Sequence, residues 1–172
     1  MKVTLYMAMS VNGIIARKNS EEDFLSDKNW LKFITLAQEH GSFIFGSKTY
    51  EAVRSWGPEY SLDGLTDVEK MVISRDTNYA LDAGYTLASS PKDALEKLSH
   101  KGLEKTLLAG GSIINGEFAK QNFIDEVILN ITPVFIGSGI PLFPDTDFQL
   151  NAELLSTKEK DGLLTLHYKI IK

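Results

Sequence analysis

The amino-acid sequence predicts a single α/β domain over residues 1–172, with a mostly parallel central sheet, an antiparallel C-terminal edge and helices on both faces. Strand-like and helix-like segments alternate over the first 125 residues, which is the pattern of βαβ units. The last segment instead reads as two strands joined at Asp161-Gly162, a dipeptide that favours a hairpin turn. No internal repeat, linker or low-complexity segment interrupts this order.

The elements follow from local patterns along the chain. Ser26 or Asp27 is suited to cap a helix, and Gly41 is suited to end it. Ser90-Pro91 is suited to open another helix, because proline is favoured at the first helical position. We expect helices over 27–39, 47–56, 112–122 and from 91 onward, and strands over 2–10, 42–46, 70–74, 85–90, 105–111 and 125–136. In the helix over 112–122, Ile113, Ile114 and Phe118 are expected to form an apolar stripe.

Composition and charge exclude several classes of function. A chain of 172 residues with 43% hydrophobic and 24% charged residues suits one globular domain. The net charge of −5, without a basic block, argues against a general nucleic-acid binder. No apolar run approaches the roughly 18 residues that cross a bilayer. We therefore expect no membrane partner, and we expect a cytoplasmic location.

Metal and thiol chemistry are not expected either. The chain has no cysteine, which excludes disulfides, thiolate catalysis and cysteine-based zinc sites. The three histidines, His40, His100 and His167, are far apart in sequence and match no metal-binding spacing.

Glycine, hydroxyl and basic residues gather where the predicted parallel strands end, and ligands of such sheets bind at those ends. "GSKTY" and "AGGS" each join a strand to a helix, and the first N–H groups of a helix suit a phosphate. Lys48 and Arg75 add two cations. This is enough for a pyrophosphate and one more phosphate, which favours NADPH over NADH. The alternative for Gly110-Gly111 is a tight strand-to-helix turn without a ligand. Neither a P-loop nor a G-x-G-x-x-G motif is present.

Longer segments resemble the dihydrofolate reductase superfamily. "MSVNGIIA" is similar to the motif "SLDG-x-IA", and "FIFGSKTYE" is similar to "IMGRxTWE". "AGGSIINGEF" and "IDEVILNITPVFIGSGIPLF" resemble the ending of riboflavin reductases, with its double glycine, "VDEL" and "G-x-G-x-PLF" signatures. The closest resemblance is to the C-terminal reductase domain of the bifunctional riboflavin-biosynthesis deaminase/reductase and its stand-alone bacterial relatives.

This resemblance implies a dihydrofolate-reductase-like three-layer sandwich, an NADPH-dependent reductase and a homodimer. It implies that Ala8 and Ile15 line the nicotinamide and that residues 12–16 form a flexible loop over it. The cofactor contacts that it implies are Ala8, Asn12, Ile15, Gly46, Ser47, Lys48, Thr49, Ser74, Arg75, Gly110, Gly111, Ser112, Ile113, Ile114 and Asn115.

The substrate side rests on two residues. Asp27 stands where dihydrofolate reductases keep a buried acid that pairs with a ring amidine, and Asn130 stands where they keep a supporting threonine. The alternatives are a plain helix cap for Asp27 and a plain polar strand residue for Asn130. Ala109 replaces the acid that riboflavin reductases usually carry before the double glycine, and Asn12 replaces an aspartate.

The function that we expect is reduction of a small heterocyclic or ribosylamino-pyrimidine substrate by NADPH. The nearest named activity is 5-amino-6-(5-phosphoribosylamino)uracil reductase. Dihydrofolate reduction is the alternative reaction. A nucleotide-binding sensor without turnover and a purely structural dimer module are the alternatives from other classes.

Overall fold

The computed structural model describes residues 1–172. In chain order, its elements are β1 (Lys2–Ser10), β2 (Ile14–Ala16), α1 (Asp27–His40), β3 (Ser42–Gly46), α2 (Ser47–Ser55), a 3₁₀ helix η1 (Pro58–Tyr60), β4 (Glu69–Ile73), β5 (Tyr85–Ala88), α3 (Pro91–His100), β6 (Lys105–Leu108), α4 (Ser112–Lys120), β7 (Glu126–Thr132), β8 (Ile140–Pro141), β9 (Asn151–Lys160) and β10 (Leu163–Ile171). No helix is both long and apolar enough to cross a membrane.

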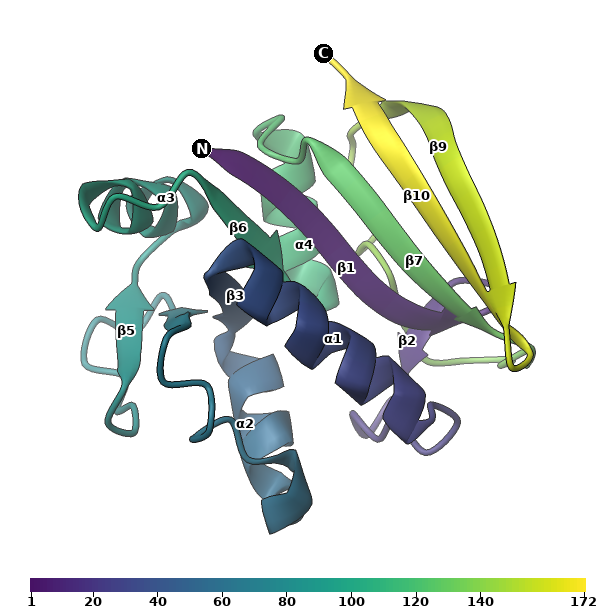
Figure 1. Ribbon diagram of the computed structural model, residues 1–172, viewed down its shortest axis with the longest axis horizontal. Coiled ribbons are helices and arrows are strands. Elements are labelled where there is room, and N and C mark those ends of the chain that lie inside the picture. Colours follow the sequence, from purple (N-terminus) through teal and green to yellow (C-terminus); the bar gives the residue numbers. More distant parts are fainter.

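Eight strands form one sheet in the order β5-β4-β3-β6-β1-β7-β10-β9. All neighbouring strands from β5 to β7 run parallel. β10 runs antiparallel to β7, and β9 runs antiparallel to β10, so the expected antiparallel C-terminal edge is confirmed. In Figure 1 this hairpin forms the yellow edge of the sheet, with α1 in front of the sheet and α4 behind it.

Two separate hydrophobic cores fill the two faces of the sheet. The core under α1 contains Phe33, Phe43 and Phe45, together with Tyr50 from α2. The core on the opposite face includes Leu98 of α3 and Phe118 of α4. Each helix buries one apolar stripe against the sheet, which gives the predicted three-layer sandwich.

The helix boundaries agree with the sequence signals. Gly41 follows α1 with φ of 70°, and its N–H bonds to the carbonyls of Ala37 and Gln38. This left-handed conformation favours glycine and ends the helix. Ser90 caps α3 with its side chain, which accepts a hydrogen bond from the N–H of Asp93. Because Gly41 ends α1, β3 begins immediately after it, at Ser42.

The structure corrects three expectations. The strand expected over 125–136 ends at Thr132, because Pro133 has no N–H to donate to a sheet. The segment 137–143, which lies outside all the expected strands, contains β8, which pairs with β2 in a two-stranded sheet. Ile113 is 57% exposed and does not share the buried stripe. Ile114 and Phe118 are four residues apart and lie on one helix face, whereas Ile113 lies about 100° away from Ile114.

Candidate active site

Two strand-to-helix turns meet at the carboxyl ends of neighbouring strands. β3 ends at Gly46, where α2 begins, and β6 is followed by Ala109-Gly110-Gly111, where α4 begins. The N–H of Gly46 donates a 2.7 Å hydrogen bond to the carbonyl of Gly110, so the two turns touch. The N-termini of α2 and α4 therefore lie at one place, and both present the partial positive charge of a helix start.

Glycine is required in these turns by close contacts. A Cβ added to Gly111 would lie 3.0 Å from Oγ1 of Thr49, and one added to Gly46 would lie 2.7 Å from Cγ1 of Ile114. Gly110 has φ of 92°, a conformation that side chains disfavour, and its peptide bond to Gly111 is cis. The surface between α2 and α4 is consequently made of main chain, with Thr49 on one side and Ile114 on the other.

Polar atoms without partners line the same turns. The hydroxyl of Ser112 is buried and forms no hydrogen bond, and neither does Oδ1 of Asn115. Nδ2 of Asn115 donates to the carbonyl of Leu142 over 2.9 Å, which fixes the side chain. A buried hydroxyl without a partner costs about 1–3 kcal/mol, so a bound group that pairs with Ser112 would be favoured.

Two cations lie exposed at the same edge of the sheet. Lys48 stands in the first turn of α2. Ser74 and Arg75 follow β4, whose last residue, Ile73, is in register with Gly46. The chain's other two arginines, Arg17 and Arg54, pair with aspartates, whereas Arg75 forms no ion pair. The helix starts, the unpaired hydroxyl and the free cations fit a dinucleotide with an extra phosphate.

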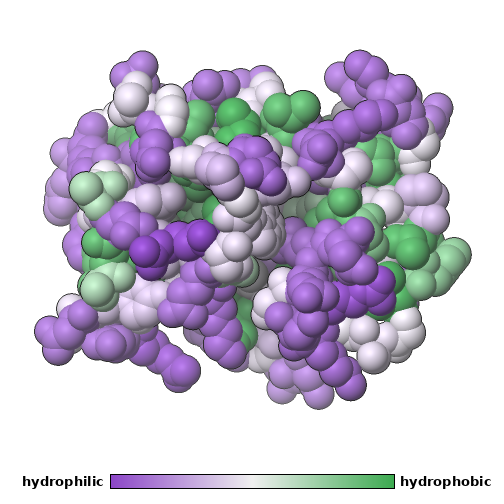
Figure 2. All heavy atoms as spheres, turned by 90° about the horizontal axis from the view of Figure 1, so that it is seen from below, coloured by the Kyte–Doolittle hydropathy of each residue, from purple (hydrophilic) through white to green (hydrophobic).

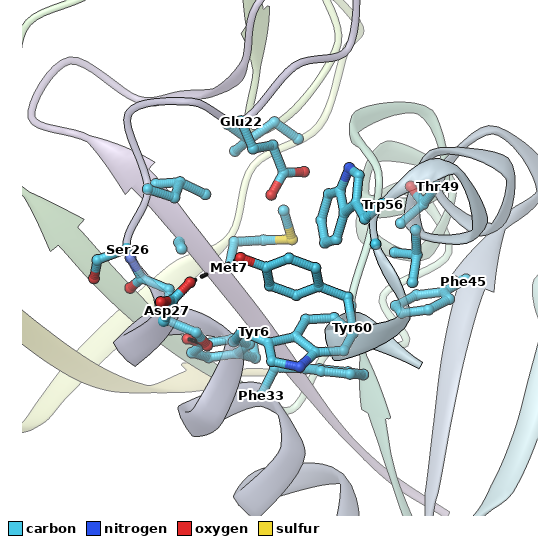
Figure 3. A pocket seen from close by; sticks show the side chains of 18 residues that line it. Tyr6, Met7, Glu22, Ser26, Asp27, Phe33, Phe45, Thr49, Trp56 and Tyr60 are labelled. Carbon is cyan, nitrogen blue, oxygen red and sulfur yellow. Dashed lines mark hydrogen bonds between the residues drawn. The ribbon is translucent and has the colours of Figure 1, made fainter. Parts of the chain in front are cut away.

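A cavity of about 350 Å³ opens beside these turns (Figure 3). Its lining is mostly hydrophobic and consists of Tyr6, Met7, Ala8, Ile15, Glu22, Leu25, Ser26, Asp27, Asn29, Trp30, Phe33, Phe45, Thr49, Val53, Trp56, Gly57, Tyr60 and Ala109. Thr49 belongs both to this wall and to the contact with Gly111. Ala8 and Ile15, the two residues expected beside a nicotinamide, also line the cavity. Figure 2 shows the face seen from below Figure 1, on which green apolar side chains are interspersed among purple polar residues.

An aromatic cluster forms one wall of the cavity. Trp30 of α1, Trp56 after α2 and Tyr60 of η1 pack edge to face, with ring centroids 5.5–5.8 Å apart. Phe33 continues this wall, 5.2 Å from Trp30. Such rings provide flat, weakly polar faces on which a planar molecule can stack.

Glu22 supplies a carboxyl group inside this apolar surrounding. It comes from the irregular segment 17–26, and in Figure 3 its carboxyl points into the cavity near Met7 and Trp56. Burial raises the pKa of Glu22 to about 7, because the charged form is poorly solvated there. At neutral pH this group can either accept or donate a proton.

Asp27 lines the rim and is exposed, in contrast to the buried carboxylate that the resemblance implies. It is the first residue of α1, and Ser26 occupies the cap position. The hydroxyl of Tyr60 donates a 2.8 Å hydrogen bond to Oδ1 of Asp27. The buried polar residue of this helix turn is Asn29, which is 4% exposed.

Asn130 lies beneath the cavity and does not line it. Its Nδ2 donates to Oδ1 of Asn29 over 3.2 Å and to the hydroxyl of Tyr6 over 3.3 Å. Its Oδ1 accepts a 2.5 Å bond from the Thr165 hydroxyl. Nδ2 of Asn29 has no partner. Asn130 thus supports two residues of the cavity wall from behind.

Asn12 holds its loop to the segment after β7. Its Oδ1 accepts from the Ser10 hydroxyl over 2.9 Å and from the N–H of Ile136 over 3.1 Å. Its Nδ2 donates to the carbonyl of Ile136 over 2.8 Å. Together with the β2–β8 pairing, these bonds tie down residues 12–16, which the resemblance implies to be a flexible loop. The side chain of Asn12 is engaged within the protein.

Nearly the whole chain matches one known protein family. Residues 1–164 match the model of the RibD C-terminal domain. The chain belongs to the RibD C-terminal domain family. Members of this family are reductases with the dihydrofolate-reductase-like fold, as the resemblance implies.

Known proteins agree with this assignment along the whole chain. An uncharacterized Bacillus subtilis protein, YwjB, is 29% identical over 174 residues, covering 97% of each chain. A crystal structure of a protein described as a riboflavin biosynthesis protein from Shewanella sp. PV-4 superposes with a TM-score of 0.83 at 21% identity and full coverage of both chains. The deaminase/5-amino-6-(5-phosphoribosylamino)uracil reductase of Thermotoga maritima superposes with a TM-score of 0.76 at 16% identity, over 99% of this chain and 56% of that one.

Several residues of this RibD-family site were missed by sequence reasoning. Glu22 lies in a charged, irregular segment that has no catalytic spacing, so nothing in the sequence distinguishes it from its neighbours. Trp56 and Tyr60 carry a weak signal, because two aromatic residues in the loop-like stretch "SWGPEY" need a packing partner. Asn29 could be found only from its position on the buried face of α1.

Proposed function

We propose that the protein is an NADPH-dependent reductase that transfers hydride to a small heterocyclic substrate. The observation that carries the proposal is the direct contact between two differently built regions. The starts of α2 and α4, residues 46–49 and 110–115, form a helix-start region that is suited to phosphate and adjoins the aromatic cavity, and Thr49 belongs to both. A reductase needs such a pair of neighbouring sites, one for the reductant and one for the acceptor.

Residues of the helix-start region, together with Ser74 and Arg75 after β4, are suited to hold the cofactor. Ser47, Lys48 and Thr49 at the start of α2 and residues 110–115 at the start of α4 would hold the pyrophosphate. Ser74 and Arg75 would hold the adenosine end with its additional phosphate. When bound, NADPH supplies the hydride. Ala8 and Ile15 are buried and apolar, so they would exclude water beside the reacting carbon.

The acceptor is proposed by chemical class. The nearest named activity is that of 5-amino-6-(5-phosphoribosylamino)uracil reductase, which the Thermotoga relative carries in its name. Reduction of dihydrofolate is the second candidate, and the observation in its favour is a carboxyl group, Glu22 or Asp27, in an aromatic cavity. Asp27 and Asn130 remain proposed as a rim acid and a positioning residue.

Turnover tests the proposal against the sensor alternative. Oxidation of NADPH is followed by absorbance with dihydrofolate, the ribosylamino-pyrimidine and related carbonyl compounds. We expect substrate-dependent oxidation with at least one of them, and slower oxidation of NADH. Tight NADPH binding with no oxidation by any of these compounds would favour a nucleotide sensor, and no NADPH binding at all would favour a structural module.

We further propose a homodimer formed through the C-terminal hairpin. All ten residues of β9 are exposed, and β9 is an edge strand that pairs only with β10. Leu154 and Leu155 of β9 and Ile171 of β10 are among the exposed large apolar residues. Exposed edges of this kind are usually covered or paired. Sedimentation at micromolar concentration should give a dimer, and Leu154→Glu should shift it toward a monomer. A monomeric wild-type protein would refute this proposal.

A further inference from the structure

The aromatic cavity contains no cationic group. Its ionisable residues are Glu22, Asp27, Tyr6 and Tyr60, and no lysine, arginine or histidine lines it. Neither of the unpaired cations lines the cavity, because Lys48 lies in the first turn of α2 and Arg75 lies after β4. A phosphate inside the cavity would lose its hydration, find no counter-charge and face carboxylates.

We propose that this cavity binds a planar nitrogen heterocycle that carries no phosphate group, and that Glu22 is the residue that determines this specificity. The inference rests on the proposed reductase function and names the substrate class of the same site. It divides the two acceptors that the family assignment leaves open, because one carries a ribosyl phosphate and the other does not.

The shape of the cavity favours a flat ring. Trp30, Trp56 and Tyr60 offer aromatic surfaces from three different elements, with centroids 5.5–5.8 Å apart. In Figure 3 the carboxyl of Glu22 points into the space beside the rings of Trp56 and Tyr60. A ring that stacks against the aromatic wall therefore meets the carboxyl group of Glu22 at its edge.

The polar groups of the cavity match the edge of such a ring. Glu22 accepts a hydrogen bond from a ring N–H when ionised, and donates one to a ring nitrogen or carbonyl when protonated. Asn29 of α1 also lines the cavity, and its buried Nδ2 has no hydrogen-bond partner within the protein. Lactam and amidine rings offer both kinds of group within one plane.

No neighbouring cation fixes the charge of Glu22, so the bound ligand determines whether this carboxyl group is protonated. The groups around it are Asp27 and Tyr60 at the rim and Tyr6 in the wall, and none of them is a cation that would hold Glu22 ionised. The Tyr60 hydroxyl is already committed to Asp27, over 2.8 Å. A ligand with a basic ring nitrogen would favour the carboxylate, and a ligand with a carbonyl would favour the protonated acid.

The two tryptophans provide a direct measurement of binding. They are the chain's only tryptophans, and both line the cavity. The probes are 5-amino-6-(5-phosphoribosylamino)uracil and the same compound without its phosphate, each titrated into the full chain with and without NADPH. We expect tryptophan quenching with a Kd at least about tenfold lower for the phosphate-free probe. A phosphorylated probe that binds equally well or better would overturn the proposal.

Two variants assign the specificity to residues. Glu22→Gln should weaken the phosphate-free probe about tenfold or more, while Glu21→Gln, at an exposed neighbour outside the cavity, should not change it. Asp27→Lys should lower the Kd of the phosphorylated probe, because it places a cation at the rim of the cavity. Unchanged binding in Glu22→Gln, with circular dichroism showing a folded protein, would overturn the role of Glu22.

The same titrations separate this proposal from the proposed function. NADPH binding is measured independently by the fluorescence of the cofactor. A protein that discriminates between the two probes but does not bind NADPH would support the substrate class and refute the reductase. A protein that binds NADPH but does not discriminate between the two probes would refute the proposed substrate class and leave the proposed reductase function supported.

Discussion

The helix-start region and the cavity lie side by side, yet the sequence specifies them in different ways. The helix-start region is made by two short, continuous segments, residues 46–49 and 110–115, and its main features are main-chain N–H groups and glycines. The cavity is made mostly by side chains, which come from β1, β2, β3, the irregular segment 17–26, α1, the end of α2 and η1. A site built from main chain depends on local sequence, whereas one built from side chains depends on how distant segments pack.

The largest expected effect comes from adding a side chain to the main chain of the helix-start region. In Gly111→Val, the new Cβ would lie 3.0 Å from Oγ1 of Thr49, and its branches would occupy the space that a phosphate needs. We expect NADPH affinity to fall by more than about 100-fold, measured by cofactor fluorescence.

Folding must be followed in parallel. Gly64→Val is the matched control, because a Cβ at Gly64 would meet nothing within 4 Å. Circular dichroism should show that both variants fold. If folded Gly111→Val binds NADPH with wild-type affinity, Gly110-Gly111 is only a strand-to-helix turn, and the main chain there does not bind the cofactor.

A smaller effect is expected for Arg75, the side chain that we propose beside the helix-start region. Arg75 is exposed and forms no ion pair, so its removal should leave the fold unchanged. Arg75→Ala should weaken NADPH by about 10–100-fold, the roughly 1–3 kcal/mol of a charge-assisted contact. Because NADH lacks the additional phosphate, its affinity should change little in Arg75→Ala. Isothermal titration with both cofactors checks this, and equal losses for the two would remove Arg75 from the phosphate site.

The smallest effect tests the electrostatics of the cavity without any ligand. Burial raises the pKa of Glu22 from 4.5 to about 7, so the folded state binds this proton more tightly than the unfolded state. The contribution of Glu22 to stability is therefore fully present below about pH 4.5 and is lost as the pH rises through about 7. Glu22→Gln removes this loss.

Urea unfolding measures that difference. At pH 8, Glu22→Gln should be more stable than the wild type by about 1–3 kcal/mol, and at pH 4 the two should be equal. Glu21→Gln should follow the wild type at both pH values. A stability difference that does not change with pH would mean that Glu22 is well solvated and is not part of an apolar cavity.

The sequence predicted what local patterns determine. The alternation of strands and helices along the chain, the beginning and end of α1, and the beginning of α3 follow from the sequence pattern and from glycine, proline and cap residues at fixed positions. The resemblance to reductases added the family and the three-layer arrangement.

What could not be predicted depends on packing between distant segments. Glu22 becomes unusual only because Trp56 and Met7 surround it, and these lie 34 residues after it and 15 residues before it. Asp27 is exposed although it holds the position of a buried acid, because it is the first residue of its helix and Asn29 turns inward instead. The pairing of β2 with β8 joins segments too short to show a strand pattern.

The central claim is that the helix-start region and the cavity form one site, in which a bound NADPH reaches the aromatic wall. Energy transfer from tryptophan to NADPH tests it most directly, because Trp30 and Trp56 both line the cavity. On titration of NADPH into the wild-type chain, we predict quenched tryptophan emission together with sensitised NADPH emission, saturating at one cofactor per chain and absent in Gly111→Val. Saturable NADPH binding by calorimetry without energy transfer would contradict the account, because the cofactor would then lie away from the cavity.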